Sequence, residues 1–463
     1  PTPSDLQSLS NRLMASSISV PVMRPVLLVV IILPSLAWSI GFLARRLYGT
    51  MPDEPMRCRF FEACGRRMAS SAFRKMISVP QLLQSLRFGL VECLWITVGM
   101  TSSSDLEQIE SRIVSLVKDF AFLHADDSVA SSCKPIADMV AKQAVTSSEG
   151  GKRLRALLTL DSFRAFASED VRERDFDALL DLACAVEVFQ TGALVHDDII
   201  DDSDLRRGKP SAHRAFSTGT HSEAIGHGFG IMLGDMLATA SVDIADKVAS
   251  KLTHGSDVVA ALLNMHREVE VGQVLDLAVD LNPLDDPDEL VEASLNVFRW
   301  KTASYTTIAP LEFGMLAAGI GRDDARKQAL AVGLPLGLAF QLADDLLDVV
   351  GSSSNTGKPV GGDIREGKRT VLLADAINAA NDTQRRELID MWETDSRSET
   401  QVKRAIELFE QTGAIERSCG RIADLWNESK TAIETLSLSE YHESLLIEAC
   451  SRFVPSIHVQ TRA

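Results

Sequence analysis

The chain has 463 residues, of which 45% are hydrophobic and 24% charged, a composition typical of globular rather than disordered proteins. The charge is uneven: residues 1–100 carry 11 Lys and Arg against 5 Asp and Glu, whereas residues 101–463 carry 36 against 59. Such an acidic body argues against nucleic-acid binding and suits a protein that gathers divalent cations.

Residues 1–99 are expected to form an N-terminal extension. It contains an uncharged run at 25–44, flanked by arginines. Twenty such residues can just cross a bilayer core about 30 Å thick, with the following basic stretch on the cytoplasmic side. A membrane anchor, an uncleaved signal-like segment and a stretch outside the working protein are three open interpretations. MTSSSDLEQIESRIVSLVKDF (100–120) has the features of a natural start, which favours the third.

Residues 100–463 are expected to form one all-α catalytic domain in the cytoplasm. Apolar residues recur there at three- and four-residue intervals, as in LEQIESRIVSLVKDFAFL and QVKRAIELFEQTGAIERSCGRIADLW. No block of alternating residues bounded by turns argues for a sheet. The seven cysteines form no CxxC pair and are expected to be incidental thiols in a reducing compartment.

Two aspartate motifs share one spacing. LVHDDIIDDSDLRRGKP (194–210) alone would be weak evidence, because acidic helix faces are common. FQLADDLLDVVG (340–351) repeats the spacing inside an apolar helix, where unpartnered charge would be very costly. Oxygen ligands at this spacing suit Mg²⁺, and two facing helices could hold a diphosphate through it. The candidate metal ligands are Asp197, Asp198, Asp201, Asp344, Asp345 and Asp348.

Basic and polar residues accompany both motifs. GGKRLR (150–155) stands at a Gly-rich helix start, where backbone N–H groups also favour an anion. Each basic residue alone is more often a solubilising surface group, but their arrangement around two metal-type helices predicts an anion site. The candidates are Lys152, Arg155, Arg206, Arg207, Lys301, Thr302, Gln341, Lys358 and Lys368.

With these motifs the sequence resembles the trans-type polyprenyl diphosphate synthases, of geranylgeranyl or longer-chain type. The resemblance runs from about residue 105 to the low 450s, through GGKRLR, HDDIIDDSDLRRGKP, GQVLD, KT, FQLADDLLD and GKPVGGDIREGK. It implies an isoprenoid-synthase helical bundle around a central cavity, a homodimer, and about three Mg²⁺ ions per active site. The implied reaction condenses isopentenyl diphosphate with an allylic diphosphate to a linear all-trans polyprenyl diphosphate. Membrane contact is expected only if the N-terminal segment is an anchor.

The resemblance also assigns roles. The six aspartates resemble ligands of Mg²⁺ on the allylic diphosphate. Arg206 and Lys301 resemble contacts of that diphosphate, and Lys368 belongs to a closing loop. Thr302, Gln341 and Lys358 resemble groups near the reacting end. The isopentenyl diphosphate clamp would comprise Lys152, Arg155, Arg207 and Gln190.

Product length depends on the helix before Asp197. Residues four and five back, Ala193 and Gly192, lie about one turn, roughly 5.4 Å, below the metal site. Large aromatics there resemble a floor that stops growth at fifteen carbons, so these small residues imply a C20 or longer product. Phe189, two turns back, is either a lower stop or an ordinary core aromatic.

Two other functions compete. A terpene cyclase would also ionise an allylic diphosphate, but would lack the GGKRLR and RRG cations and carry a different second motif. A non-catalytic regulatory subunit of a prenyl synthase would have lost metal carboxylates. Both motifs and the cations are complete here, which favours the synthase.

Overall fold

The structure is a computed structural model that describes residues 104–122, 128–351, 360–394 and 396–455. All of them lie in the second of two units into which the chain divides, Ile96–Ala463. The expected extension at 1–99, with its run at 25–44, lies outside the described residues, and so does Lys358.

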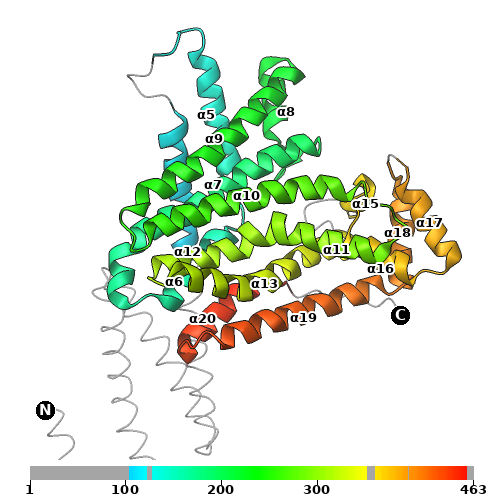
Figure 1. Ribbon diagram of the computed structural model, residues 1–463. Helices are drawn as coiled ribbons and strands as arrows, with labels where there is room; N and C mark the ends of the chain where they lie inside the picture. Colours follow the sequence, from blue (N-terminus) through cyan, green and yellow to red (C-terminus); the bar gives the residue numbers. More distant parts are fainter. Residues whose placement is uncertain (1–103, 123–127, 352–359, 395, 456–463) are drawn as a thin grey trace, which may run out of the picture. The chain divides into compact units, whose positions relative to one another are not determined.

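The described part is almost wholly helical, which confirms the expected all-α class (Figure 1). A helix at 104–121 comes first. A short hairpin, whose two strands have two residues each, follows the first aspartate motif. A π-helix, η1, interrupts the series of α-helices. The further elements are α5 (Lys134–Ser148), α6 (Leu154–Phe166), α7 (Glu169–Ile200), β1 (Leu205–Arg206), β2 (Lys209–Pro210), α8 (Ala212–Thr220), α9 (Glu223–Ala249), α10 (Gly255–Val279), α11 (Pro287–Val297), η1 (Phe298–Ile308), α12 (Ala309–Ala317), α13 (Arg322–Val350), α15 (Gly362–Glu366), α16 (Val371–Ala379), α17 (Asp382–Trp392), α18 (Glu399–Gln411), α19 (Ala414–Glu434) and α20 (Glu440–Ser451).

Long helices pack side by side around the site. α7 lies along α9, and α13 lies beside α19 (Figure 1). α13 also contacts η1. Among the described residues, three helices, α7, α9 and α13, are long and apolar enough to cross a membrane by length and composition alone. In α7, 78% of the most apolar stretch is buried inside the bundle, against 44% in α9. Apolar surface therefore remains exposed on α9.

Two glycines let η1 approach its neighbours closely. A Cβ atom on Gly272 of α10 would overlap the backbone of Lys301, and one on Gly337 of α13 would overlap Ala303. Because both residues lack a side chain, η1 can fit between α10 and α13. This packing brings Lys301 and Thr302 of η1 toward both aspartate motifs. π-helical turns are frequent at functional sites, and η1 follows that tendency.

Candidate active site

The first motif lies at the C-terminal end of α7, where Asp197 and Asp198 both face Arg206. Asp198 is 2% exposed and pairs with the guanidinium of Arg206, whose Nε lies 2.8 Å from Oδ1. Arg206 Nη2 also lies 3.9 Å from Asp197 Oδ2. In the structure Asp198 therefore holds Arg206 beside the motif. The carboxylate predicted as a metal ligand is occupied with this arginine, and its role as a ligand stays a prediction.

Lys301 links η1 to the first motif. Its Nζ lies 3.2 Å from Asp197 Oδ1 and 2.5 Å from Asp276 Oδ2 on α10. Burial alone would lower the pKa of Lys301, but these two carboxylates together raise it above its usual value. The ammonium is therefore firmly charged and is held where the first motif ends.

The second motif connects to η1 through a hydrogen-bonded chain. Thr302 Oγ1 donates to Gln341 Oε1 at 2.9 Å, and Gln341 Nε2 donates to Asp345 Oδ1 at 2.8 Å. Asp345 is 7% exposed, and its Oδ2 has no hydrogen-bond partner within the described residues. Asp344, in contrast, is exposed. The family resemblance implies that Thr302 and Gln341 lie near the reacting end of the allylic diphosphate. In the structure Gln341 contacts Asp345, and Thr302 contacts Gln341.

Asp348 holds the Gly-rich loop after α13. Its two carboxylate oxygens accept hydrogen bonds from the backbone N–H groups of Gly362 and Asp363, each at 3.1 Å. A carboxylate at a helix N-terminus is favourable, and here it ties α15 to α13. Asp348 thus positions α15 in this structure, and its role as a metal ligand stays a prediction.

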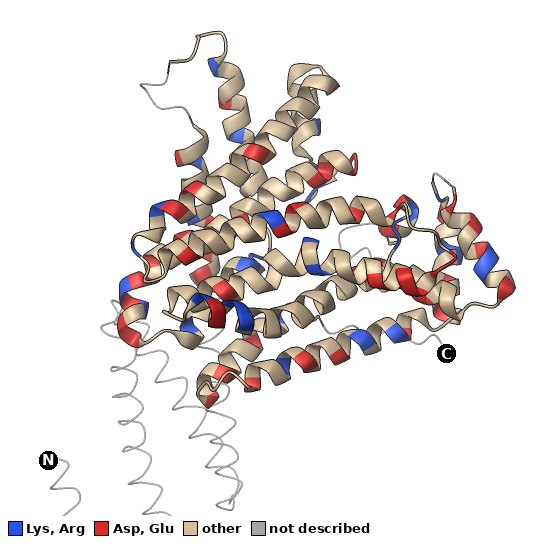
Figure 2. Ribbon diagram, in the orientation of Figure 1, with Lys and Arg blue, Asp and Glu red and all other residues tan. Residues whose placement is uncertain are grey.

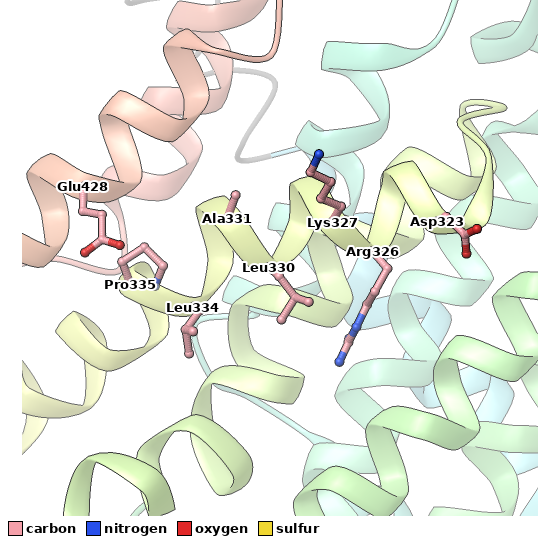
Figure 3. A pocket seen from close by; sticks show the side chains of 8 residues that line it. All are labelled: Asp323, Arg326, Lys327, Leu330, Ala331, Leu334, Pro335 and Glu428. Carbon is pink, nitrogen blue, oxygen red and sulfur yellow. The ribbon is translucent and has the colours of Figure 1, made fainter. Parts of the chain in front are cut away.

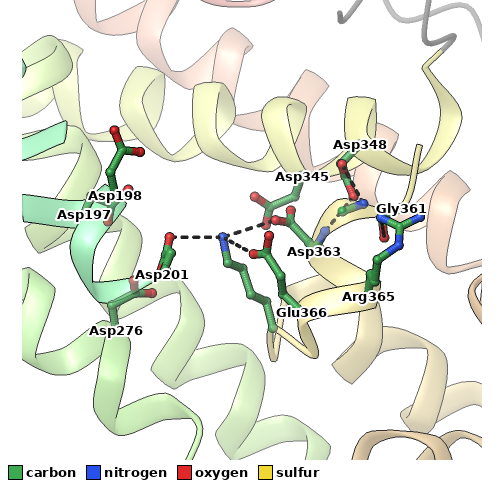
Figure 4. Close-up of polar contacts among 12 residues, drawn as sticks. Asp197, Asp198, Asp201, Asp276, Asp345, Asp348, Gly361, Asp363, Arg365 and Glu366 are labelled. Carbon is green, nitrogen blue, oxygen red and sulfur yellow. Dashed lines mark hydrogen bonds and ion pairs between the residues drawn. The ribbon is translucent and has the colours of Figure 1, made fainter. Parts of the chain in front are cut away.

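Lys368 contacts Asp201 of the first motif and two carboxylates of α15, the short helix that follows the second motif. Figure 4 shows these three carboxylates, Asp201, Asp363 and Glu366, near one another. Lys368 Nζ is 4.0 Å from Asp201 Oδ2 of the first motif. It is 3.4 Å from Asp363 Oδ1 and 3.2 Å from Glu366 Oε2 on α15. Burial would lower the pKa of Lys368, but the surrounding carboxylates raise it well above its usual range. The space between the motifs therefore favours positive charge.

A carboxylate in each motif, Asp201 in the first and Asp345 in the second, has a pKa above its usual value. Burial raises the pKa of Asp345, and the charges of Asp363 and Asp344 raise it further. Burial likewise raises the pKa of Asp201, with a further contribution from Asp197. A divalent cation would stabilise these charged forms. Asp345 Oδ2 has no hydrogen-bond partner in the described segments, and with it this donor set of hard oxygens fits Mg²⁺.

Basic residues gather beside the first motif in what we call the basic corner, which comprises Arg206, Arg207 and Lys209. Arg207 Nη1 donates to the backbone oxygen of Glu149 at 2.8 Å, next to the GGKRLR segment. Burial and the nearby charges of Arg153 and Arg206 lower the pKa of Arg207, which indicates crowded positive charge. A cavity of about 50 Å³ is lined by Arg206, Arg207 and Lys209, among others. The concentration of positive charge in the basic corner favours the binding of an anion such as a diphosphate.

The structure separates the other predicted clamp residues. Lys152 is exposed, whereas Arg155 is buried with its guanidinium 4.1 Å from the centroid of the Tyr305 ring and its Nη2 2.7 Å from Thr306 Oγ1. The N-terminal N–H groups of α6, expected to favour an anion, donate to the buried carboxylate of Glu187 instead. Gln190 is half-buried on α7. The clamp roles of these residues stay predictions.

The three predicted chain-length residues also differ in their surroundings. A Cβ atom on Gly192 would lie 2.9 Å from Gly234 O of α9, so close packing of two helices requires glycine there. Ala193 is half-buried. Phe189 is 5% exposed, with its ring centroid 4.0 Å from that of His266. Helix packing explains Gly192 without a product pocket, which leaves Ala193 and Phe189 as candidates for the floor.

A larger groove lies elsewhere. It measures about 570 Å³ and is lined by the first half of α13, from Asp323 to Pro335, and by Glu428 of α19 (Figure 3). Pro335, the lining residue of α13 nearest to the second motif, is nine residues before Asp344, or about 13 Å along the helix at 1.5 Å per residue, and no lining residue belongs to either motif. Acidic and basic residues are interspersed over the described helices (Figure 2). The groove is therefore separate from the two motifs.

Sequence reasoning missed three residues of this site. Asp276 pairs with Lys301, Asp363 faces Lys368, and buried Glu187 caps α6. Asp276 and Asp363 stand in GQVLD and GGDIREGK, which were noted without assigning these carboxylates. Glu187 stands alone in the apolar stretch ACAVEVF, where an unpaired charge would be costly. That signal could have identified it.

Comparison with known proteins agrees with this geometry. Residues 138–409, which include both aspartate motifs, match the family model described as polyprenyl synthetase. The chain belongs to the polyprenyl synthetase family. This polyprenyl synthetase is 30% identical over 331 residues to a short chain isoprenyl diphosphate synthase of Methanothermobacter thermautotrophicus, covering 70% of this chain and 93% of that protein.

Two further relatives agree. A geranylfarnesyl diphosphate synthase of Aeropyrum pernix is 33% identical over 270 residues, covering 58% of this chain and 78% of that protein. A crystal structure of geranylgeranyl pyrophosphate synthase from Corynebacterium glutamicum, complexed with isoprenyl diphosphate and magnesium, matches with a TM-score of 0.65 and 30% identity. That match covers 75% of this chain and 97% of the other. The expected family and fold are confirmed, and this polyprenyl synthetase is a prenyltransferase.

Proposed function

We propose that this polyprenyl synthetase condenses isopentenyl diphosphate with an allylic diphosphate to a linear all-trans polyprenyl diphosphate of C20 or longer. The observation that carries the proposal is the position of Lys368, between Asp201 of the first motif and Asp363 beside the second. Two carboxylate motifs with cations between and beside them suit a diphosphate–Mg²⁺ complex. The small side chain of Ala193 supports the longer product.

The residues of the chain would act by positioning and electrostatics. Arg206, Lys301 and Lys368 bind the allylic diphosphate and stabilise charge on it as the C–O bond breaks. The oxygens of Thr302 and Gln341 lie near the carbocation, and the packed helices exclude water. The double bond of isopentenyl diphosphate forms the new C–C bond, and a proton then leaves to the released diphosphate. No protein nucleophile is needed.

Mg²⁺ is the cofactor of this proposal, with about three ions per site. When bound, it would neutralise charge on the departing diphosphate. Asp197, Asp198 and Asp201 of the first motif and Asp344, Asp345 and Asp348 of the second would hold it. Asp345 Oδ2, which has no hydrogen-bond partner among the residues that the structure describes, supports this donor set.

A homodimer is part of the proposal. Large apolar side chains are exposed along α9 and α10, and contiguous exposed apolar surface marks interaction sites. A second copy of the chain would bury them, which sedimentation at several protein concentrations would detect. These residues are Ile225, Ile231 and Met232 on α9, Leu263, Val271, Val274 and Leu277 on α10, and Leu281 just beyond it. We place the catalytic domain in the cytoplasm, with membrane contact only if residues 25–44 are an anchor.

The test is an incubation of the full chain with Mg²⁺, labelled isopentenyl diphosphate and a panel of allylic diphosphates, followed by product sizing. Linear products of C20 or longer are expected. Cyclic hydrocarbons formed without consuming isopentenyl diphosphate would identify a cyclase, and absence of product would favour a regulatory subunit. A parallel incubation of residues 100–463 would show whether the extension is needed.

A further inference from the structure

A second cluster of possible metal ligands lies beside the active site. Asp202 follows α7, His213 lies in the first turn of α8, and His227 lies in the first half of α9. One ligand atom from each residue lies within 4.8 Å of the other two. Three elements that are separate in sequence therefore bring two imidazoles and one carboxylate together.

His213 has an unsatisfied nitrogen. The residue is 0% exposed, and its Nδ1 lies 3.3 Å from Ser211 Oγ. Its Nε2 has no hydrogen-bond partner in the part of the chain that the structure describes. A buried polar atom without a partner costs free energy, which a ligand on Nε2 would recover.

The other two residues, Asp202 and His227, could turn toward a metal ion with the loss of few present contacts. His227 is half-buried and stacks on His213, with ring centroids 5.1 Å apart and an interplanar angle of 14°. A turn about its side-chain bonds would direct a nitrogen to the same point. Asp202 accepts a hydrogen bond from Arg214 Nη2 at 2.8 Å. Arg214 would keep its second partner, since its Nε lies 2.9 Å from Asp204 Oδ1.

We propose that Asp202, His213 and His227 form a Zn²⁺ site that is distinct from the carboxylate site for Mg²⁺. Two imidazole nitrogens and one carboxylate oxygen are a ligand set that Zn²⁺ binds, with water in the fourth position. Mg²⁺ prefers oxygen ligands, so it does not compete for this set.

The site connects both ends of the segment that carries Arg206 and Arg207. Asp202 stands directly after Asp201 of the first motif, and His213 follows the hairpin β1–β2. Zn²⁺ would tie these ends to each other and to α9. The bound metal therefore orders the basic corner beside the first motif, although it touches no substrate.

The test titrates Zn²⁺ into the full, metal-free chain in excess Mg²⁺, by isothermal calorimetry. Excess Mg²⁺ competes with Zn²⁺ for the carboxylate motifs, and the variants below separate Zn²⁺ bound there from Zn²⁺ bound at the imidazoles. We expect one Zn²⁺ per chain. His227→Ala and, at an exposed carboxylate, Asp202→Asn should each weaken binding by at least about 100-fold, since loss of an outer partner alone costs 10- to 100-fold.

Two matched variants serve as controls. His254→Ala removes a half-buried histidine from the start of α10, and Asp344→Asn removes a carboxylate of the second motif. Both should bind Zn²⁺ like the unchanged chain, and X-ray absorption at the zinc edge should show two nitrogen ligands. The proposal would be overturned if the unchanged chain bound no Zn²⁺ in excess Mg²⁺, or if folded His227→Ala bound Zn²⁺ as tightly as the unchanged chain. Loss of Zn²⁺ binding in Asp344→Asn alone would overturn it as well. Folding of each variant is checked by circular dichroism.

Discussion

Lys301 Nζ lies 2.5 Å from Asp276 Oδ2, and this contact joins η1 to α10 at the edge of the first aspartate motif. The pairing depends on Gly272, which stands one turn before Asp276 and lets the two helices approach. Asp276 does not need to touch the substrate to matter, because it holds the ammonium that faces Asp197.

Replacing Asp276 tests this positioning role. Asp276→Asn removes one of the two carboxylates around Lys301, so the lysine loses its fixed place and its pKa falls. We expect kcat/KM for the allylic diphosphate to fall by about 10²-fold, the cost of a small misplacement at a reacting centre. The control is Glu270→Gln, which changes an exposed carboxylate elsewhere on α10. Equal activity of the two variants would contradict the role.

Mg²⁺ should stabilise the protein through Asp345. Metal binding to the folded state alone raises the melting temperature. Buried Asp345 Oδ2, which lacks a hydrogen-bond partner within the part of the chain that the structure describes, is a point where the metal would bind. We expect calorimetry to show a clear rise in Tm with Mg²⁺ for the unchanged chain and a much smaller one for Asp345→Asn. Asp246→Asn, at an exposed position on α9, should behave like the unchanged chain. The same rise in all three proteins would remove Asp345 from the metal site.

Ala193 and Gly192 should respond differently to enlargement. Ala193→Phe should shorten the product, measured by chromatographic sizing, with little change in Tm. Gly192→Ala should instead destabilise the fold by roughly 1–3 kcal/mol, because the added methyl overpacks the contact with Gly234 and Leu237 of α9. An unchanged product from Ala193→Phe would rule out this residue as part of the pocket floor.

Acid should destabilise the protein through His266. This imidazole is buried against Phe189, with its Nε2 3.0 Å from Ser241 Oγ, and burial lowers its pKa from 6.5 to about 4. In the unfolded chain it takes up a proton near pH 6.5, so stability is lost as the pH falls from about 6.5 to about 4. The contribution is roughly 3 kcal/mol, at 1.36 kcal/mol per unit. Denaturant unfolding at several pH values should show a smaller acid loss for His266→Gln than for His254→Gln.

Much of this protein followed from patterns within short stretches. The 3.6-residue periodicity predicted the helices, because an apolar stripe on a helix must be buried whichever partner covers it. The repeated spacing of aspartates predicted two acidic helix faces, since residues three and four apart lie on one side of a helix. Both predictions concern residues close in sequence, and the family and the all-α fold were confirmed.

The partners of individual side chains could not be predicted in the same way. Asp198 pairs with Arg206, Asp348 caps α15, and Glu187 occupies the N–H groups expected to bind an external anion. Each of these carboxylates carries the same charge and could bind a metal, an arginine or a helix terminus. Local spacing therefore cannot distinguish among them.

The amino-acid sequence alone was enough to establish the helices, the two aspartate motifs and the family. Only the tertiary structure decided that Asp276 holds Lys301, that Gly192 serves helix packing, and that His213 meets His227. The physical reason is distance: periodicity acts over one or two turns, whereas each of these contacts joins residues on different helices. Those contacts depend on how closely the helices approach, which is set by packing across the whole bundle.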